Sequence, residues 1–230
     1  MKHIIMVPGL GSDAAVWQPT IAELASDVEC QVGNTLSDDT LPAMAARILG
    51  NAPHRFALAG VSMGGMVALE IMRLAPERVT KLALFDTNAR PDTPEQTARR
   101  RSTNAAMLGT ADLATLAAPW IAYMVHPSAG QDVRAVLAEM TVRVGATAYV
   151  RQNEAIIARN DLRPVLASVS VPTIVVVGAD DLMTPLDCSQ EISDGIAGAI
   201  LHIIPDCGHL PPIERPRVVA DLLGKWLRGR

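Results

Sequence analysis

One stretch, residues 56–65 with the sequence FALAGVSMGG, constrains the fold more than any other. A short apolar run predicts a buried strand, a single serine follows in the spacing G-x-S-x-G, and an apolar segment then predicts a helix. This order fits a sharp strand-to-helix turn, because Gly60 and Gly64 carry no side chain that could clash where the backbone bends. Ser62 would stand at the apex, beside the unpaired N–H groups of the helix start. Ser62 is therefore a candidate nucleophile; the alternative is a small-residue turn of the kind found in many α/β folds.

The remainder of the chain alternates between strand-like and helix-like segments. Apolar runs at residues 4–7, 28–32, 55–59, 79–85, 171–178 and 200–204 predict six strands. Strands that alternate with helices predict right-handed crossovers, and hence an α/β fold with a mostly parallel six-stranded sheet flanked by helices. Between residues 88 and 160 only helical patterns occur, at 93–107, 113–124, 131–144 and 147–159. We therefore predict one α/β domain over residues 1–230, with a core of residues 1–87 and 161–230 and a helical insertion at 88–160.

Composition narrows the possible partners. The 230 residues suit a single domain, and a net charge of −4 argues against nucleic acid or an anionic membrane as a partner. Three cysteines without a CxxC pair suggest neither a disulfide framework nor a zinc site, so we expect no metal and no cofactor. No apolar run is long enough for a signal peptide or a membrane span, which favours the cytoplasm.

A serine hydroxyl becomes a strong nucleophile only when a base removes its proton and a third group orients that base. His209 follows the last predicted strand, and Asp180 and Asp181 follow the strand before it. The carboxyl ends of parallel strands share one edge of the sheet, where open α/β sheets hold their sites. The chain thus offers a serine, an acid and a histidine in that order.

These three segments, GVSMGG, VGADDLMTP and CGHLPPIERP, resemble the nucleophile elbow, the acid loop and the histidine loop of the α/β-hydrolase fold family. The resemblance covers essentially the whole chain and is nearest to the small-cap serine esterase and enol-lactonase-like branch. It implies an α/β-hydrolase fold in which the helical insertion is a cap over the pocket. It also implies Ser62 as nucleophile, His209 as general base and then general acid, and an aspartate that orients His209.

Several aspartates compete for the orienting role. In relatives the acid stands three residues after the glycine that ends its strand, which favours Asp181 over Asp180. Asp86 follows an earlier strand, from which some relatives take the acid, and it is a minor rival. Asp206, beside the histidine loop, is predicted to be a turn residue.

The resemblance further implies an oxyanion hole made by the backbone N–H groups of Leu10 and Met63. Relatives commonly have His-Gly where this chain has Pro8-Gly9, but a hole built from backbone groups does not need that histidine. Candidate pocket residues, each with ordinary core packing as the alternative, are Trp120, Tyr123, Met124, His126 and Met140 from the insertion and Trp17 from below.

The predicted function is cofactor-independent hydrolysis of a small carboxylic ester or lactone through an acyl-enzyme. The apolar candidates for the pocket favour an apolar acyl or alcohol group in this small-molecule substrate. Residues 99–101, all arginine, could select an anionic substrate but are interpreted mainly as a solvated helix face. Two alternatives use the same fold: a hydrolase of C–C bonds in activated diketones, and a sensor whose hydrolase-like pocket only binds a small molecule.

Overall fold

The computed structural model describes residues 2–229, and its centre is a six-stranded sheet in the order β2-β1-β3-β4-β5-β6. Every neighbouring pair of strands is parallel, which confirms the predicted fold class. The strands are β1 (Lys2–Val7), β2 (Val28–Val32), β3 (Phe56–Val61), β4 (Val79–Phe85), β5 (Thr173–Gly178) and β6 (Ile200–Ile204).

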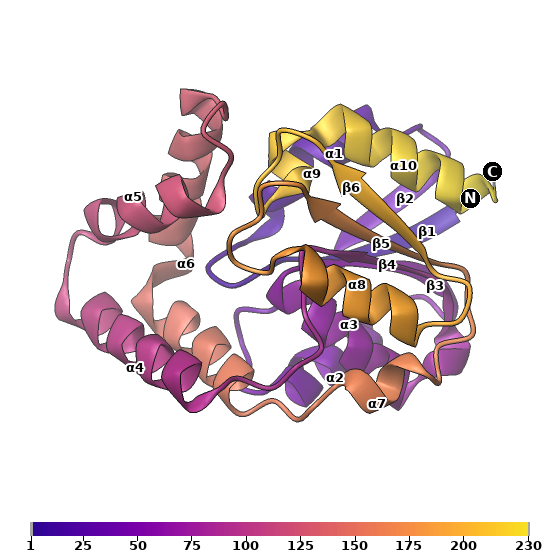
Figure 1. Ribbon diagram of the computed structural model, residues 1–230, viewed down its shortest axis with the longest axis horizontal. Helices are drawn as coiled ribbons and strands as arrows, with labels where there is room; N and C mark the ends of the chain where they lie inside the picture. Colours follow the sequence, from indigo (N-terminus) through magenta and orange to yellow (C-terminus); the bar gives the residue numbers. More distant parts are fainter. Residues whose placement is uncertain (1, 230) are drawn as a thin grey trace.

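Helices cover both faces of the sheet (Figure 1). One layer contains α2 (Leu41–Asn51), α3 (Met63–Leu74), α7 (Arg163–Leu166) and α8 (Leu186–Gly195), and the other contains α1 (Gln18–Glu23), α9 (Pro211–Glu214) and α10 (Pro216–Arg228). Two short 3-10 helices lie at Ala14–Val16 and Pro76–Arg78. Successive strand residues alternate between the two layers: Ile5 and Leu58 pack toward α3, whereas Met6 and Ala59 pack toward α10.

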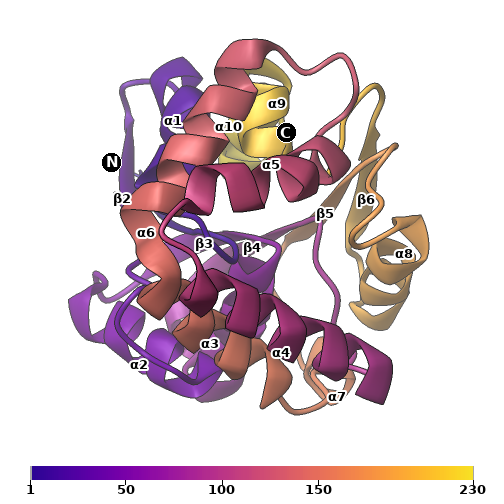
Figure 2. The same ribbon diagram turned by 90° about the vertical axis from the view of Figure 1, so that its left-hand side faces the viewer.

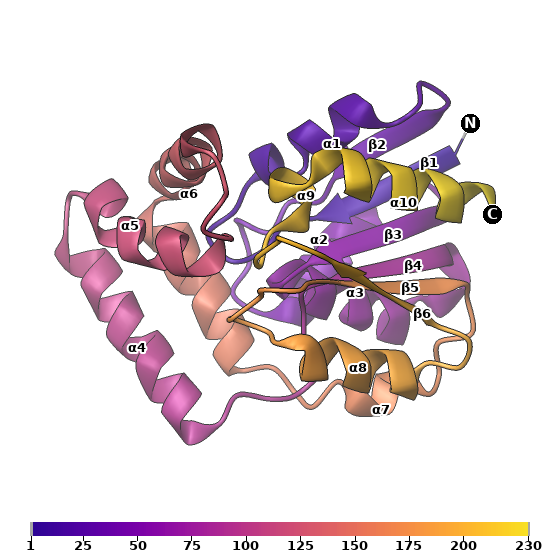
Figure 3. The same cartoon turned by 45° about the horizontal axis from the view of Figure 1, so that its top comes forward.

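Three further helices lie between β4 and β5 in the chain: α4 (Pro94–Gly109), α5 (Leu113–Met124) and α6 (Gln131–Ile157). This α4–α6 insertion stands at one end of the sheet (Figures 1 and 3), and the second half of α6 packs into the same core as α3. Gly145 interrupts α6 with a positive φ of 73°, so α6 consists of two helical halves that meet at a kink. No helix in residues 2–229 has both the length and the apolar character needed to cross a membrane.

Candidate active site

The turn between β3 and α3 explains why the chain needs glycines around Ser62. Ser62 has φ 56° and ψ −120°, a conformation that few residues other than glycine adopt. A Cβ on Gly60 would lie 2.2 Å from the carbonyl oxygen of Gly64, and a Cβ on Gly64 would lie 2.1 Å from the carbonyl oxygen of Val7. The hydroxyl of Thr87 donates to the Ser62 carbonyl at 2.7 Å and so holds the turn from β4. The strained serine is therefore fixed from several sides.

Ser62, His209 and Asp181 form a continuous chain of hydrogen bonds. The Oγ of Ser62 lies 2.9 Å from Nε2 of His209, and Nδ1 of His209 lies 2.9 Å from Oδ2 of Asp181. The ionised carboxylate of Asp181 can only accept hydrogen bonds, so we assign a proton to Nδ1 of His209. This leaves Nε2 free to accept a hydrogen bond from the serine hydroxyl. Both His209 and Asp181 are buried. This arrangement can deprotonate the serine during attack on a carbonyl.

Asp181 is held by its own loop. Its Oδ1 accepts from the N–H groups of Met183 at 2.7 Å and Thr184 at 3.2 Å, and its Oδ2 accepts from the Thr184 hydroxyl at 2.7 Å. Burial by itself would raise the pKa of Asp181, but the charge and hydrogen bond of His209 and the donors of this loop together lower it. Asp180, in contrast, is half exposed, and its carboxylate lies 3.7 Å from Nε2 of His126. The geometry thus brings Asp181, and not Asp180, to the histidine.

A second carboxyl group, that of Asp86, is fully buried beside this pair. Asp86, Asp181 and His209 each have a polar atom within 4.8 Å of the other two. Oδ1 of Asp86 accepts from the Gly178 N–H at 2.8 Å, whereas Oδ2 has no partner among residues 2–229. Burial, and then the neighbouring charge of Asp181, raise the pKa of Asp86 well above its usual range. Both ring nitrogens of His209 already bond to Ser62 and Asp181, so His209 has no free nitrogen to offer a metal ion.

The candidate oxyanion hole is held in part by the insertion. Within the described residues, neither the Leu10 nor the Met63 N–H has a protein acceptor. The next amide along the first loop, that of Gly11, donates at 2.8 Å to Oε1 of Gln152 from α6. Gln152 is fully buried, and its Nε2 donates to the carbonyl and the hydroxyl of Thr35. Sequence reasoning missed Gln152, because a single glutamine in a mixed helical segment gives no local signal of such a contact.

The loop that carries the histidine is also braced. The buried carboxylate of Glu214 accepts from the N–H groups of Gly208 at 3.1 Å, Leu210 at 3.0 Å and His126 at 2.8 Å. Backbone N–H groups that donate to a carboxylate form strong, charge-assisted hydrogen bonds. Since His209 lies between two of these donors, Glu214 fixes its backbone. The sequence placed Glu214 in the histidine-loop motif but did not indicate this role.

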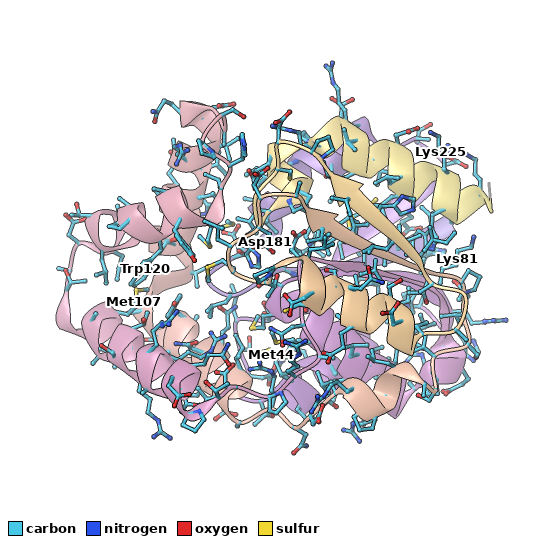
Figure 4. The ribbon with its side chains drawn as sticks, viewed as in Figure 1. Met44, Lys81, Met107, Trp120, Asp181 and Lys225 are labelled. Atoms are coloured by element: carbon cyan, nitrogen blue, oxygen red, sulfur yellow. The ribbon has the colours of Figure 1, made fainter. Side chains whose placement is uncertain are left out.

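A cavity of about 330 Å³ opens above Ser62, His209 and Leu10. The insertion contributes Trp120, Tyr123, Met124 and Met140 to its lining, while His126 is not part of that lining. Figure 4 shows Trp120 on the α4–α6 insertion and Asp181 at the facing end of the sheet. Tyr149 also borders the cavity, and burial raises the pKa of its phenol to about 12, so it remains neutral at physiological pH.

Two expectations about individual side chains need correction. Trp17 does not line the cavity, because its fully buried ring packs edge-on against Phe85 in the core, with ring centroids 5.5 Å apart. The three consecutive arginines are not simply a solvated helix face either. Arg99 and Arg100 border the cavity, whereas Arg101 is exposed and does not. The α-helical rotation of about 100° per residue separates these neighbours.

The sequence model of the Alpha/beta hydrolase family matches residues 4–222, so the chain belongs to that family. Among curated proteins, it is 25% identical to a putative carbamate hydrolase, RutD, of Variovorax paradoxus, over 94% of this chain and 88% of that protein. It is 26% identical to the pimeloyl-[acyl-carrier protein] methyl ester esterase of Nitrosomonas europaea, over 93% of this chain and 90% of that protein.

Solved structures give the same result. A thermophilic esterase from Thermogutta terrifontis is 27% identical and superposes with a TM-score of 0.90, over 100% of this chain and 90% of that one. The enol-lactonase of Burkholderia xenovorans LB400 has a TM-score of 0.87 at 24% identity, over 99% of this chain and 91% of that one, which shows a shared fold. Esterase and carbamate hydrolase relatives together support hydrolase activity of the esterase type.

Proposed function

We propose that this protein is a serine hydrolase that cleaves a small carboxylic ester or lactone through an acyl-enzyme. The observation that carries the proposal is the hydrogen-bonded chain from Ser62 through His209 to Asp181 at the floor of the cavity, with both distances 2.9 Å. A serine placed in this way has a base within reach, and the base has a buried acceptor that fixes its tautomer.

The reaction proceeds in two stages. Ser62 Oγ attacks the carbonyl carbon while His209 Nε2 takes the hydroxyl proton, and the N–H groups of Leu10 and Met63 stabilise the resulting oxyanion. The intermediate collapses, His209 returns the proton to the leaving alkoxide, and an alcohol departs from the acyl-enzyme. Water then attacks the acyl-enzyme carbonyl while His209 takes its proton, and the collapse of this second intermediate frees Ser62 and a carboxylic acid. In a lactone the alcohol that leaves the carbonyl stays joined to the acyl group through its carbon chain, so the only product released is a hydroxy acid.

The α4–α6 insertion has a place in the proposal. We propose that residues 88–160 form a cap on the α/β core and that Trp120, Tyr123 and Met124 contact the substrate there. The link from Gln152 to the first loop couples this cap to the oxyanion hole. A cap that shields the site from water strengthens the electrostatic interactions on which the transition state depends.

A fluorophosphonate probe tests the nucleophile. We expect one adduct by intact mass, mapped to the peptide of Ser62 and abolished in Ser62→Ala. Ser12→Ala is the matched control, because Ser12 borders the same cavity but its hydroxyl has one hydrogen bond within residues 2–229, to the Leu10 carbonyl at 3.5 Å. A folded protein that is not labelled, or that is labelled equally in Ser62→Ala, would contradict the proposal.

Turnover of short-chain esters and lactones tests the reaction. We expect saturable, repeated turnover, with release of acid that Ser62→Ala lacks. Single turnover at most would favour a sensor, and turnover of an activated diketone without turnover of any ester or lactone would favour C–C hydrolysis.

A further inference from the structure

The cavity above Ser62 has two chemically different sides. α5 and the first half of α6 contribute apolar side chains: Ala117, Trp120, Ile121, Met124, Leu137 and Met140. Polar side chains come from the segment before α4, from α4 itself and from the second half of α6. Five of them, which we call the α4 wall, are Asp92, Gln96, Arg99, Arg100 and Asn153. Figure 2 shows α5 and α4 as separate helices of the insertion, with α5 above α4, so the apolar and polar groups come from different helices.

The α4 wall carries more positive than negative charge. Asp92 is the one carboxylate that lines the cavity within residues 2–229, and it is enclosed by two arginines. Arg100 Nε lies 2.7 Å from its Oδ2, and Arg159 Nη1 lies 2.8 Å from its Oδ1. The side chains of Asp92 and Arg159 are only 2% and 1% exposed, so Arg159 balances Asp92 from behind the wall. Glu154, the next acid in this network, accepts from Asn104 and does not line the cavity. The charges of Arg99 and Arg100 therefore face the cavity largely uncompensated.

Unused hydrogen-bond donors accompany this charge. Arg100 uses Nε for Asp92 and Nη1 for the Asn153 side chain, whose oxygen lies at 2.9 Å, and its Nη2 has no partner among the described residues. The same two bonds hold the guanidinium in place. The side chain of Arg99, within α4, forms no ion pair or hydrogen bond with the other residues of 2–229. A guanidinium that is positioned by the protein and still has free N–H groups is well suited to a carboxylate oxygen.

We propose that the α4 wall binds a carboxylate on the substrate, so that the preferred substrates are esters with an apolar group and, away from the scissile bond, a second, ionised carboxyl group. This inference rests on the proposed ester hydrolysis and deepens it. Because Arg159 offsets Asp92, Arg99 and Arg100 leave an excess of positive charge beside the cavity, which suits an anionic group such as a carboxylate.

The test compares monomethyl esters of linear dicarboxylic acids, from four to eight carbons, with methyl esters of the monocarboxylic acids of equal chain length. We expect the wild type to favour the charged ester in kcat/KM, mainly through a lower KM, at one or two chain lengths. The ratio of the charged to the neutral kcat/KM should fall about tenfold in Arg100→Gln and about threefold in Arg99→Gln, because Arg99 is more exposed. Arg101→Gln is the matched control on the same helix and should keep the wild-type ratio.

Each result separates this inference from the proposed function. If neutral esters turn over at least as well as charged ones at every length, or if Arg101→Gln lowers the ratio as much as Arg99→Gln, the α4 wall is not a carboxylate site while ester hydrolysis stands. If Arg100→Gln fails to fold, Arg99→Gln decides, since that side chain has no protein partner to lose. If no ester turns over, calorimetry of the charged and neutral esters with Ser62→Ala decides: equal binding or no binding overturns the inference.

Discussion

Replacing Asp86 with Asn should stabilise the protein by an amount that grows with pH. Asp86 is fully buried, and the raised pKa means that the folded protein keeps its carboxyl protonated at pH values where the unfolded chain ionises it. The native state then binds more protons than the unfolded state, so stability falls as pH rises. Below the unfolded pKa of about 4 the carboxyl is protonated in both states and costs no stability, and the free energy of unfolding then falls progressively as pH rises toward the folded pKa.

The magnitude follows from one proton. Between the two pKa values Asp86 lowers the free energy of unfolding by about 1.4 kcal/mol per pH unit, and Asn, which does not titrate, removes that loss. Asn also suits the site, because Oδ2 of Asp86 has no partner among residues 2–229 that the exchange would remove, and because Asn tolerates the positive φ of 41° at this position.

Urea unfolding of both proteins at half-unit steps from pH 4.5 to 8 provides the measurement. The stability difference should start near its smallest value and climb with pH. Asp206→Asn is the control for the exchange itself, because Asp206 also has a positive φ, of 51°, but is exposed. A difference between Asp86→Asn and the wild type that does not change with pH, or that falls as pH rises, would show that Asp86 is not held protonated in the folded protein.

Three further predictions concern the candidate site. Asp181→Asn should lower kcat for an ester substrate by about 10⁴ because the wrong tautomer of the histidine is favoured, whereas Asp180→Asn should stay within a few-fold of wild type; the reverse order would reassign the acid. Gln152→Leu leaves the buried N–H of Gly11 unpaired, so it should lower the free energy of unfolding, measured in urea, by about 1–3 kcal/mol and lower kcat more than it raises KM. Unchanged stability and kcat would show that the hydrogen bond between Gln152 and Gly11 is dispensable. Gly64→Ala would place a Cβ 2.1 Å from a β1 carbonyl oxygen and should unfold the protein or abolish fluorophosphonate labelling of Ser62. The control Gly50→Ala, in open space on α2, should raise the free energy of unfolding by about 0.5–1 kcal/mol. A well-folded, active Gly64→Ala protein would contradict this prediction.

The fold was predictable because its signals are local. Apolar runs of strand length and helical periodicity lie within a dozen residues of each other, and the order in which they alternate leaves few possible topologies. The sequence therefore predicted the parallel six-stranded sheet that the structure and the family match confirm. It also separated two helical patterns at the position where Gly145 kinks α6.

The candidate site was predictable only in outline. The sequence placed Ser62, Asp181 and His209 after strands that end at one edge of the sheet, but the 2.9 Å distances between their side chains depend on the tertiary structure. Trp17 was misplaced because an aromatic residue after the first loop looks the same in sequence whether its ring faces the core or a cavity.

Local sequence signals were enough to predict the set of elements, their order, and the turn that only glycines allow around Ser62. Which distant residues meet depended on the packing of the whole chain: Gln152 contacts a loop amide 141 positions earlier, and Asp86 lies buried beside an aspartate on the neighbouring strand's loop. The physical reason is that backbone conformation is set by neighbours along the chain, whereas burial, charge and the direction of a side chain are set by the surfaces that pack against it.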